Sequence, residues 1–166
     1  ADATRATLGL DLTDYVITDA PLEVELRTAD SGASWGTIGN PGSLLRAAEK
    51  LIKLGGAEAI AVVARFPDDT SESLQNYRHG SGVDHIAGAE AVISHLIVRQ
   101  FQIPAAHAPA LLPLAIDPEV SPRTAAEELG YTFLPCVLVG LSRAPQFITT
   151  TSNSHDVIWS DEVDMV

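Results

Sequence analysis

The chain has 166 residues, of which 46% are hydrophobic, and its formal net charge is −12. This length and composition suit one compact domain over residues 1–166 whose core is stable without metals or crosslinks, and they exclude a disordered chain. The negative charge argues against a nucleic acid or an anionic membrane surface as a partner, because both would repel the protein.

The cysteine content and the start of the chain predict a cytoplasmic protein. Cys136 is the only cysteine, so no internal disulfide can form and a reducing compartment is expected. The apolar neighbours of Cys136 predict that it is a buried strand residue. No apolar run approaches the roughly 18 residues of a membrane span, and the first residues are too polar for a signal peptide.

The first half of the chain predicts a strand, a helix and a second strand. Residues 14–20 form the first apolar run, and a long irregular connection follows over residues 21–39. A helix is expected over residues 40–56, because a proline stands at its first position, glycines stand at its end and its apolar residues recur at helical spacing. The continuous apolar run 57–66 predicts a strand covered on both faces, as in parallel sheets.

The second half continues the alternation. A polar loop is expected over residues 67–82, and a helix over residues 83–100. Residues 102–108 predict a third strand, which a proline restricts to a sheet edge. Residues 121–130 have the serine cap, first-turn proline and terminal glycine of a short helix. The apolar run 132–141 predicts a fourth strand.

This order predicts an α/β domain with a mainly parallel sheet and helices packed on its faces, either three-layered or partly Rossmann-like. In such sheets, ligands bind outside the carboxyl ends of the strands. Arg65, His107 and Arg143 follow or end predicted strands, so we expect them at this edge.

Four histidines lie in the stretch RHGSGVDHIAGAEAVISHLIVRQFQIPAAHAPAL, residues 78–111. Its glycines precede a helix, as in a loop that holds phosphate, but their spacing is not G-x-G-x-x-G. Ser81 followed by Asp84 is typical of an ordinary helix cap. His79 and His85 flank this turn, but the four histidines lack the spacing of metal ligands, so no metal or other cofactor is predicted.

The hypothesis that follows is a pocket that binds or converts a small anionic metabolite, a carboxylate or a phosphate. Imidazole titrates nearest neutrality and suits a general acid or base, while guanidinium groups hold anions bidentately. A buried histidine with a carbonyl partner explains His107 equally well, and the arginines could instead pair with acidic residues. The candidate catalytic residues are His107, His79 and Asp84, and the candidate ligand-binding residues are Arg65, His85 and Arg143.

The alternative is a non-catalytic binding or assembly subunit that acts through protein–protein contacts. No G-x-S-x-G elbow, Ser-His-Asp order or CxxC motif is present, so acyl transfer and redox chemistry lack a motif. A small chain with many apolar residues can also leave a surface patch for a partner. Expected partners are therefore a small anionic ligand, a second copy, or a missing part of the same protein.

Four segments resemble a known family: DYVITDAPLEVELRT, GAEAIAVVARFPDD, YRHGSGVDHIAGAEAV and SPRTAAEELGYTFLP. The family is the uncharacterised one of cyanobacteria and plastid-bearing relatives called domain of unknown function 3326. This resemblance implies longer family members and no assigned activity, so it transfers no catalytic residue. We therefore expect a piece of a longer protein, with exposed apolar surface near residues 8–10 and 163–166 that a second copy covers.

Overall fold

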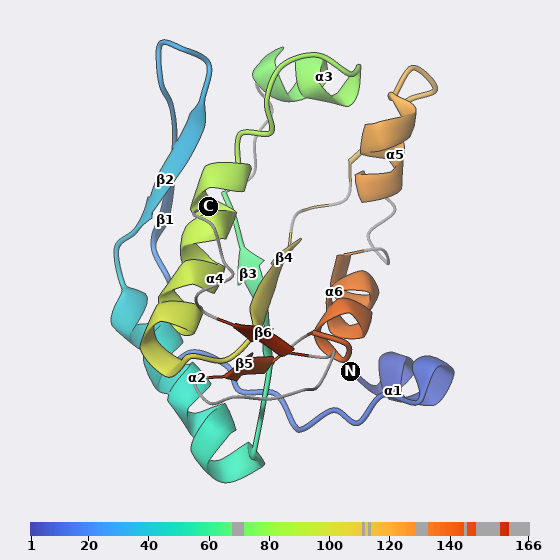
Figure 1. The fold of residues 1–166 in the computed structure, drawn as a ribbon. Coiled ribbons are helices and arrows are strands. Elements are labelled where there is room, and N and C mark those ends of the chain that lie inside the picture. Colours follow the sequence, from blue (N-terminus) through green and yellow to red (C-terminus); the bar gives the residue numbers. More distant parts are fainter. Residues whose placement is uncertain are drawn as a thin grey trace.

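The computed structural model describes residues 1–67, 72–110, 112, 114–128, 133–144, 146–148 and 157–159. Its helices and strands are arranged as Figure 1 shows. In chain order they are α1 (Asp2–Leu8), β1 (Val24–Thr28), β2 (Ser34–Ile38), α2 (Pro41–Gly55), β3 (Ile60–Arg65), α3 (Glu72–Arg78), α4 (Ala87–Phe101), β4 (Ala105–Ala110), α5 (Pro122–Glu128), α6 (Phe133–Leu141), β5 (Gln146–Ile148) and β6 (Val157–Trp159).

The described strands form three two-stranded sheets. β1 pairs with β2 antiparallel, β3 with β4 in parallel, and β5 with β6 in parallel. The predicted α/β class is confirmed in its coarse form, which is small sheets packed against helices. The predicted Rossmann-like sheet is not formed by the described residues, because two of its four expected strands, residues 14–20 and 132–141, are not strands.

Residues 133–141 of the last predicted strand form helix α6 instead. A short continuous apolar run is compatible with a buried strand or with a helix, and its periodicity does not distinguish them. Pro135 lies in the first turn of α6, where its missing N–H has no intrahelical acceptor to lose. Cys136 is exposed on this helix, so the prediction that Cys136 is a buried strand residue is wrong.

The connection 21–39, predicted to be irregular, contains the β1–β2 hairpin. Val24 lies opposite Ile38 and Leu26 opposite Gly36 in its register. Val24, Leu26 and Ile38 pack against the buried core, while the residues between them face outward. This period-two alternation was the signal for a strand, but the five-residue turn lacks the Asn-Gly or Asp-Gly pair that marks a tight hairpin.

The predicted polar loop 67–82 contains a further helix, α3, and α4 begins at Ala87 rather than at Val83. The predicted helices over residues 40–56 and 121–130 are confirmed as α2 and α5, and the predicted strands over residues 57–66 and 102–108 are confirmed as β3 and β4. Pro41 opens α2, and Gly56 ends it with a left-handed φ of 65°. Ser121 caps α5, because its Oγ accepts a hydrogen bond from the Thr124 N–H at 3.3 Å.

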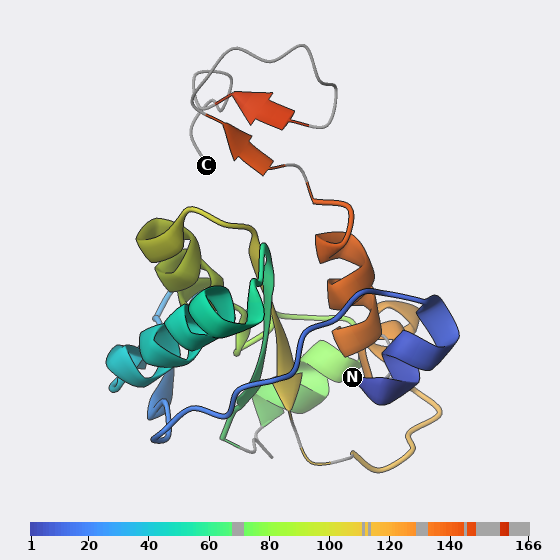
Figure 2. The same ribbon diagram turned by 90° about the horizontal axis from the view of Figure 1, so that it is seen from below.

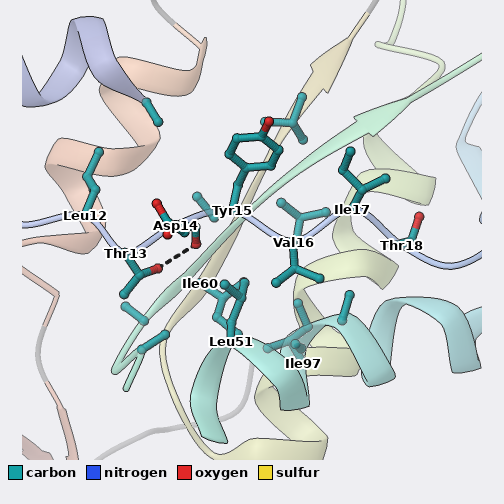
Figure 3. A pocket seen from close by; sticks show the side chains of 18 of the residues that line it. Leu12, Thr13, Asp14, Tyr15, Val16, Ile17, Thr18, Leu51, Ile60 and Ile97 are labelled. Carbon is teal, nitrogen blue, oxygen red and sulfur yellow. Dashed lines mark hydrogen bonds between the residues drawn. The ribbon is translucent and has the colours of Figure 1, made fainter. Parts of the chain in front are cut away.

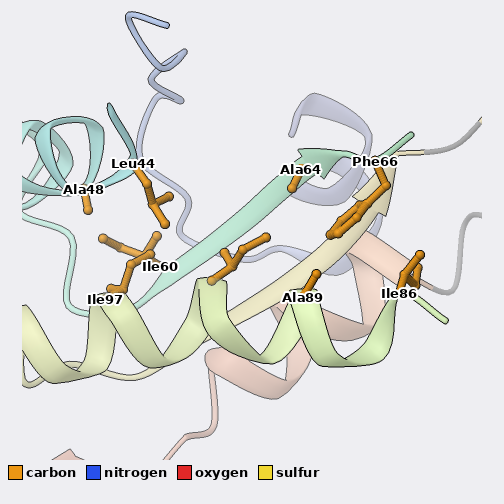
Figure 4. Close-up of a cluster of buried hydrophobic side chains, with 9 residues drawn as sticks. Leu44, Ala48, Ile60, Ala64, Phe66, Ile86, Ala89 and Ile97 are labelled. Carbon is orange, nitrogen blue, oxygen red and sulfur yellow. The ribbon is translucent and has the colours of Figure 1, made fainter. Parts of the chain in front are cut away.

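The core lies between β3 and two helices, as Figure 4 shows. The buried cluster joins β3 and the residue after it to α4, the residue before it, and α2. Its members are Ile60, Ala64 and Phe66, then Ile86, Ala89, Ile93 and Ile97, and finally Leu44 and Ala48. The path from β3 through α4 to the parallel strand β4 is a β-α-β crossover, whose helix covers one face of its strands. α6 lies on the other side of the strand pair (Figure 2).

Glycines allow α4 to approach β2 closely. A Cβ atom at Gly88 would lie 2.6 Å from both the Ser34 oxygen and the Trp35 Cα, and one at Gly36 would lie 2.6 Å from the Ala89 Cβ. The contacts at Gly88 are with backbone atoms, which cannot rotate away. The helix and the hairpin therefore depend on the absence of a side chain at Gly88.

We expect Gly88→Ala to lower the free energy of unfolding by about 1–3 kcal/mol, because the added methyl overpacks this contact. Gly140→Ala is the matched control, since Gly140 is also helical but a Cβ there meets nothing within 4 Å. That change should stabilise the protein by up to about 1 kcal/mol through helix propensity. Urea unfolding of both variants measures the difference. Equal effects would contradict the close packing of α4 on β2.

Candidate functional site

Two of the predicted site residues lie on the paired strands β3 and β4. His107 lies opposite Val62 in the strand pair, and Arg65 lies opposite Ala110 at the ends of both strands. α4 leads into β4 and packs along it, so the first turns of α4 lie beside the carboxyl end of β4. His107 is the third of the six residues of β4, so it lies midway along the strand, beside the first half of α4.

His107 contacts two side chains of α4. Its Nδ1 lies 2.7 Å from Ser94 Oγ, and its Nε2 lies 3.9 Å from Glu90 Oε2. Ser94 follows Glu90 by four residues, so both project from the same face of the helix. The His107 side chain is 30% exposed, whereas the Glu90 side chain is only 11% exposed. A molecule from solvent therefore reaches the imidazole before the carboxyl group.

Burial and neighbouring charges shift both groups toward their neutral forms. Burial, followed by the negative charges of Asp84 and Glu127, raises the pKa of Glu90 from 4.5 to about 7. Burial and then the nearby His95 lower the pKa of His107. Near neutral pH, a carboxyl group that can hold a proton thus lies beside an uncharged imidazole. Such a pair can donate and accept protons, as general acid–base chemistry requires.

Asp84 and His85 lie in the turn that precedes α4. Asp84 Oδ1 accepts a hydrogen bond from the Ile86 N–H at 3.1 Å. The predicted capping arrangement with Ser81 is not formed, because the Ser81 hydroxyl donates to a carbonyl of α3 instead. Asp84 therefore contributes its charge to the surroundings of Glu90, and half-buried His85 is next to it in the chain.

His79 belongs to a second polar cluster, which joins α3 to α5. Its Nε2 lies 3.0 Å from Asp117 Oδ2. Arg78, which is only 4% exposed, pairs with Glu128 through contacts of 2.6 and 3.1 Å and donates to the Ala115 carbonyl at 3.0 Å. The Glu128 carboxylate raises the pKa of Arg78 further. These contacts hold α3 and α5 together, and none of them involves His107, Glu90 or Ser94.

The two predicted ligand-binding arginines lie at opposite ends of β3. The Arg65 guanidinium donates to the carbonyls of Phe66 and Ala110, at the carboxyl edge. Arg143 lies in the turn after α6, and its neighbours Ser142 and Ala144 line a hollow together with residues that precede β3. Arg65 therefore lies at the carboxyl end of the strand pair, three residue pairs beyond His107, and Arg143 lies near the other end of β3.

Sequence reasoning missed Glu90 and Ser94. Both stand inside the apolar helix segment AGAEAVISHL, where a glutamate that is 8% exposed is unusual. The available signal was their spacing of four residues, but nothing in the sequence linked this spacing to His107 on β4. Within the described residues, no group of three or more His, Cys, Asp and Glu side chains is placed to hold a metal ion.

Comparisons with known proteins agree with the resemblance found in the sequence. A family model described as "Protein of unknown function (DUF3326)" matches residues 1–166. An uncharacterized lipoprotein of Synechococcus sp. is 64% identical to this chain across its whole length, and the chain spans 46% of that relative. No solved structure matches the chain. The predicted family resemblance is confirmed.

The predicted cytoplasmic localisation is wrong. The relative that is 64% identical to this chain over the aligned residues is named a lipoprotein, and a lipoprotein is held at a membrane by a covalently attached lipid. The prediction relied on a single cysteine and on polar first residues, but the lack of a disulfide does not by itself assign a protein to a compartment. No helix among the described residues has the length and apolar character needed to cross a membrane.

Proposed function

We propose a function for this chain, which belongs to the family described as Protein of unknown function (DUF3326), from the geometry of its own residues. It binds and converts a small metabolite that carries a carboxylate or a phosphate. The observation that carries this proposal is the cluster of Glu90, Ser94 and His107, which forms where α4 packs along β4. Titratable groups whose pKa values are shifted by burial are typical of active sites.

Each residue of the cluster has a distinct part in the proposed reaction. His107, the more exposed group, takes a proton from the substrate or returns one, and Ser94 fixes the orientation of its ring through Nδ1. Glu90, whose pKa is about 7, holds a proton in reserve on the other side of the ring. The anionic end of the substrate lies toward Arg65, because Asp84 and Glu127 repel it from the start of α4.

A thermal-shift screen of phosphorylated and carboxylated metabolites on the full-length protein tests this proposal. We expect a ligand that raises the melting temperature of the wild type, and we expect His107→Gln to weaken its binding by about tenfold, or about 1.4 kcal/mol. His79→Gln is the control, because His79 lies in the α3–α5 cluster. Loss of binding in His79→Gln but not in His107→Gln would contradict the proposed site.

A second candidate function is assembly through protein–protein contacts. Tyr15 is 77% exposed, Ile17 is 79% exposed and Val63 is 54% exposed, which favours a partner on this face. Leu8, near one of the predicted apolar ends, is 45% exposed, whereas residues 163–166 lie outside the described part of the chain. Light scattering of the full-length protein distinguishes the two functions, since an assembly subunit forms a stable oligomer or complex.

A further inference from the structure

A hollow lies between residues 12–18 and the sheet, and its lining includes none of His107, Glu90 and Ser94. Its inner chamber has a volume of about 470 Å³. Figure 3 shows residues 12–18 crossing the chamber, with Leu51, Ile60 and Ile97 across from them. This volume lies within the range of about 300–1,000 Å³ that is typical of sites for small molecules.

The inner chamber is lined by side chains from the hydrophobic core. Leu44, Ala48, Ile60 and Ile97 belong to the buried cluster, and each of them also lines the chamber. Protein interiors are packed as densely as organic crystals, so an apolar space of this size next to the core has the character of a binding chamber. Leu138 of α6 forms part of its remaining wall.

The chamber continues into an outer hollow of about 910 Å³ that is more polar. Tyr15, Leu51 and Leu138 line both spaces, so the two are continuous. The outer hollow has three carboxylates, Asp11, Asp14 and Glu58, and one cation, Lys50.

The side chains that line the outer hollow carry an excess of negative charge, because three carboxylates stand against one lining cation, Lys50. Asp14 also lies 3.8 Å from the Arg5 guanidinium, which is not part of the lining. The hollow therefore favours a positively charged group over an anion.

The segment above the chamber can move without breaking regular structure. Residues 15–18 belong to no helix or strand, and their backbone makes no hydrogen bond to another described residue. Tyr15 and Ile17 are largely exposed, whereas Val16 between them is half-buried over the chamber. A ligand thus meets an apolar wall that it can displace at low cost.

From this combination we infer that the hollow binds an amphiphile, with its apolar body in the inner chamber and a cationic end among Asp11, Asp14 and Glu58. The core residues around the chamber exclude water from the apolar body, and the carboxylates of the outer hollow attract the cationic end. This site is separate from the His107 cluster and does not rest on the proposed reaction.

Binding of three probes with the same alkyl chain, octylamine, octanol and octanoate, to the full-length protein tests this inference by calorimetry. We expect octylamine to bind most tightly and octanoate least tightly. Ala47→Phe, which fills the chamber, should weaken octylamine binding by about tenfold or more. Glu58→Gln should reduce the preference for octylamine over octanol while keeping the chamber intact.

Matched controls lie away from the hollow. Ala125→Phe adds the same ring to an exposed helical alanine of α5, and Asp30→Asn removes a carboxylate at the β1–β2 turn. Neither should change binding, and nor should His107→Gln. The inference is overturned if octanoate binds as well as octylamine, if Ala47→Phe binds like the wild type, or if light scattering shows a dimer that Ala47→Phe dissociates, since a second copy would then fill the chamber.

Discussion

Arg78→Met is expected to lower the free energy of unfolding by about 3 kcal/mol. Arg78 is only 4% exposed, and its guanidinium pairs with Glu128 and donates to the Ala115 carbonyl. Methionine keeps much of the side-chain volume but removes every polar contact. The Glu128 carboxylate then stays at the α3–α5 contact without its cation, which costs more than the pair itself contributes.

Arg46→Met is the matched control for this prediction. Arg46 also forms a two-contact pair, with Asp19 at 2.6 and 2.7 Å, but its side chain is 58% exposed. Water replaces the lost partner at such a site, so we expect little or no change in stability. Urea unfolding followed by circular dichroism compares the two variants. If both lose the same free energy, burial does not set the strength of the Arg78 pair.

Above pH 7, Glu90→Gln is expected to have a free energy of unfolding about 3 kcal/mol higher than that of the wild type. The pKa of Glu90 is raised from 4.5 to about 7 in the folded protein, chiefly by burial. Because each unit of pKa corresponds to about 1.36 kcal/mol, a rise from 4.5 to about 7 gives a stability difference of about 3 kcal/mol. Glutamine cannot ionise, so the variant escapes the cost of holding a buried carboxylate.

The sign follows from proton binding in the two states. Below pH 4.5, Glu90 is protonated in both the folded and the unfolded chain, and it adds no difference between them. Between pH 4.5 and about 7 the folded state binds the proton more tightly, so stability falls as the pH rises. Above about pH 7 the loss is complete. The variant and the wild type should therefore match at low pH and diverge toward pH 8.

Unfolding of wild type and variant in urea at pH values from 4 to 8 measures this divergence, because the difference between the two profiles isolates Glu90 from other titrating groups. Glu72→Gln, which changes an exposed glutamate of α3, should keep the wild-type profile. A constant difference between Glu90→Gln and the wild type over this range would contradict the raised pKa.

Local patterns in the sequence were sufficient for the elements whose signals do not depend on distant residues. α2 has a proline at its start, a glycine at its end and an apolar face, and each of these acts within a few residues. The serine cap of α5 is equally local. β3 and β4 were predicted because apolar or small residues that run continuously are typical of parallel strands.

The sequence was ambiguous where the same residues suit two structures. The run that forms α6 is apolar throughout, so it has neither a helical stripe nor a strand alternation to read. The β1–β2 hairpin had the alternation but no tight-turn pair, so its two strands were merged into one loop. In both cases the choice depends on which surface the segment meets, and that surface comes from other parts of the chain.

The candidate site divides in the same way. The sequence by itself determined that His107 and Arg65 belong to strands and that Asp84 precedes a helix, since each of these places is set by neighbouring residues, although His107 lies midway along β4 rather than at its end. Only the tertiary structure decided that Glu90 and Ser94 meet His107, and that Arg143 lies at the far end of β3. The β-α-β crossover brings α4 against β4, and the burial created there, rather than any motif, shifts the pKa values of Glu90 and His107.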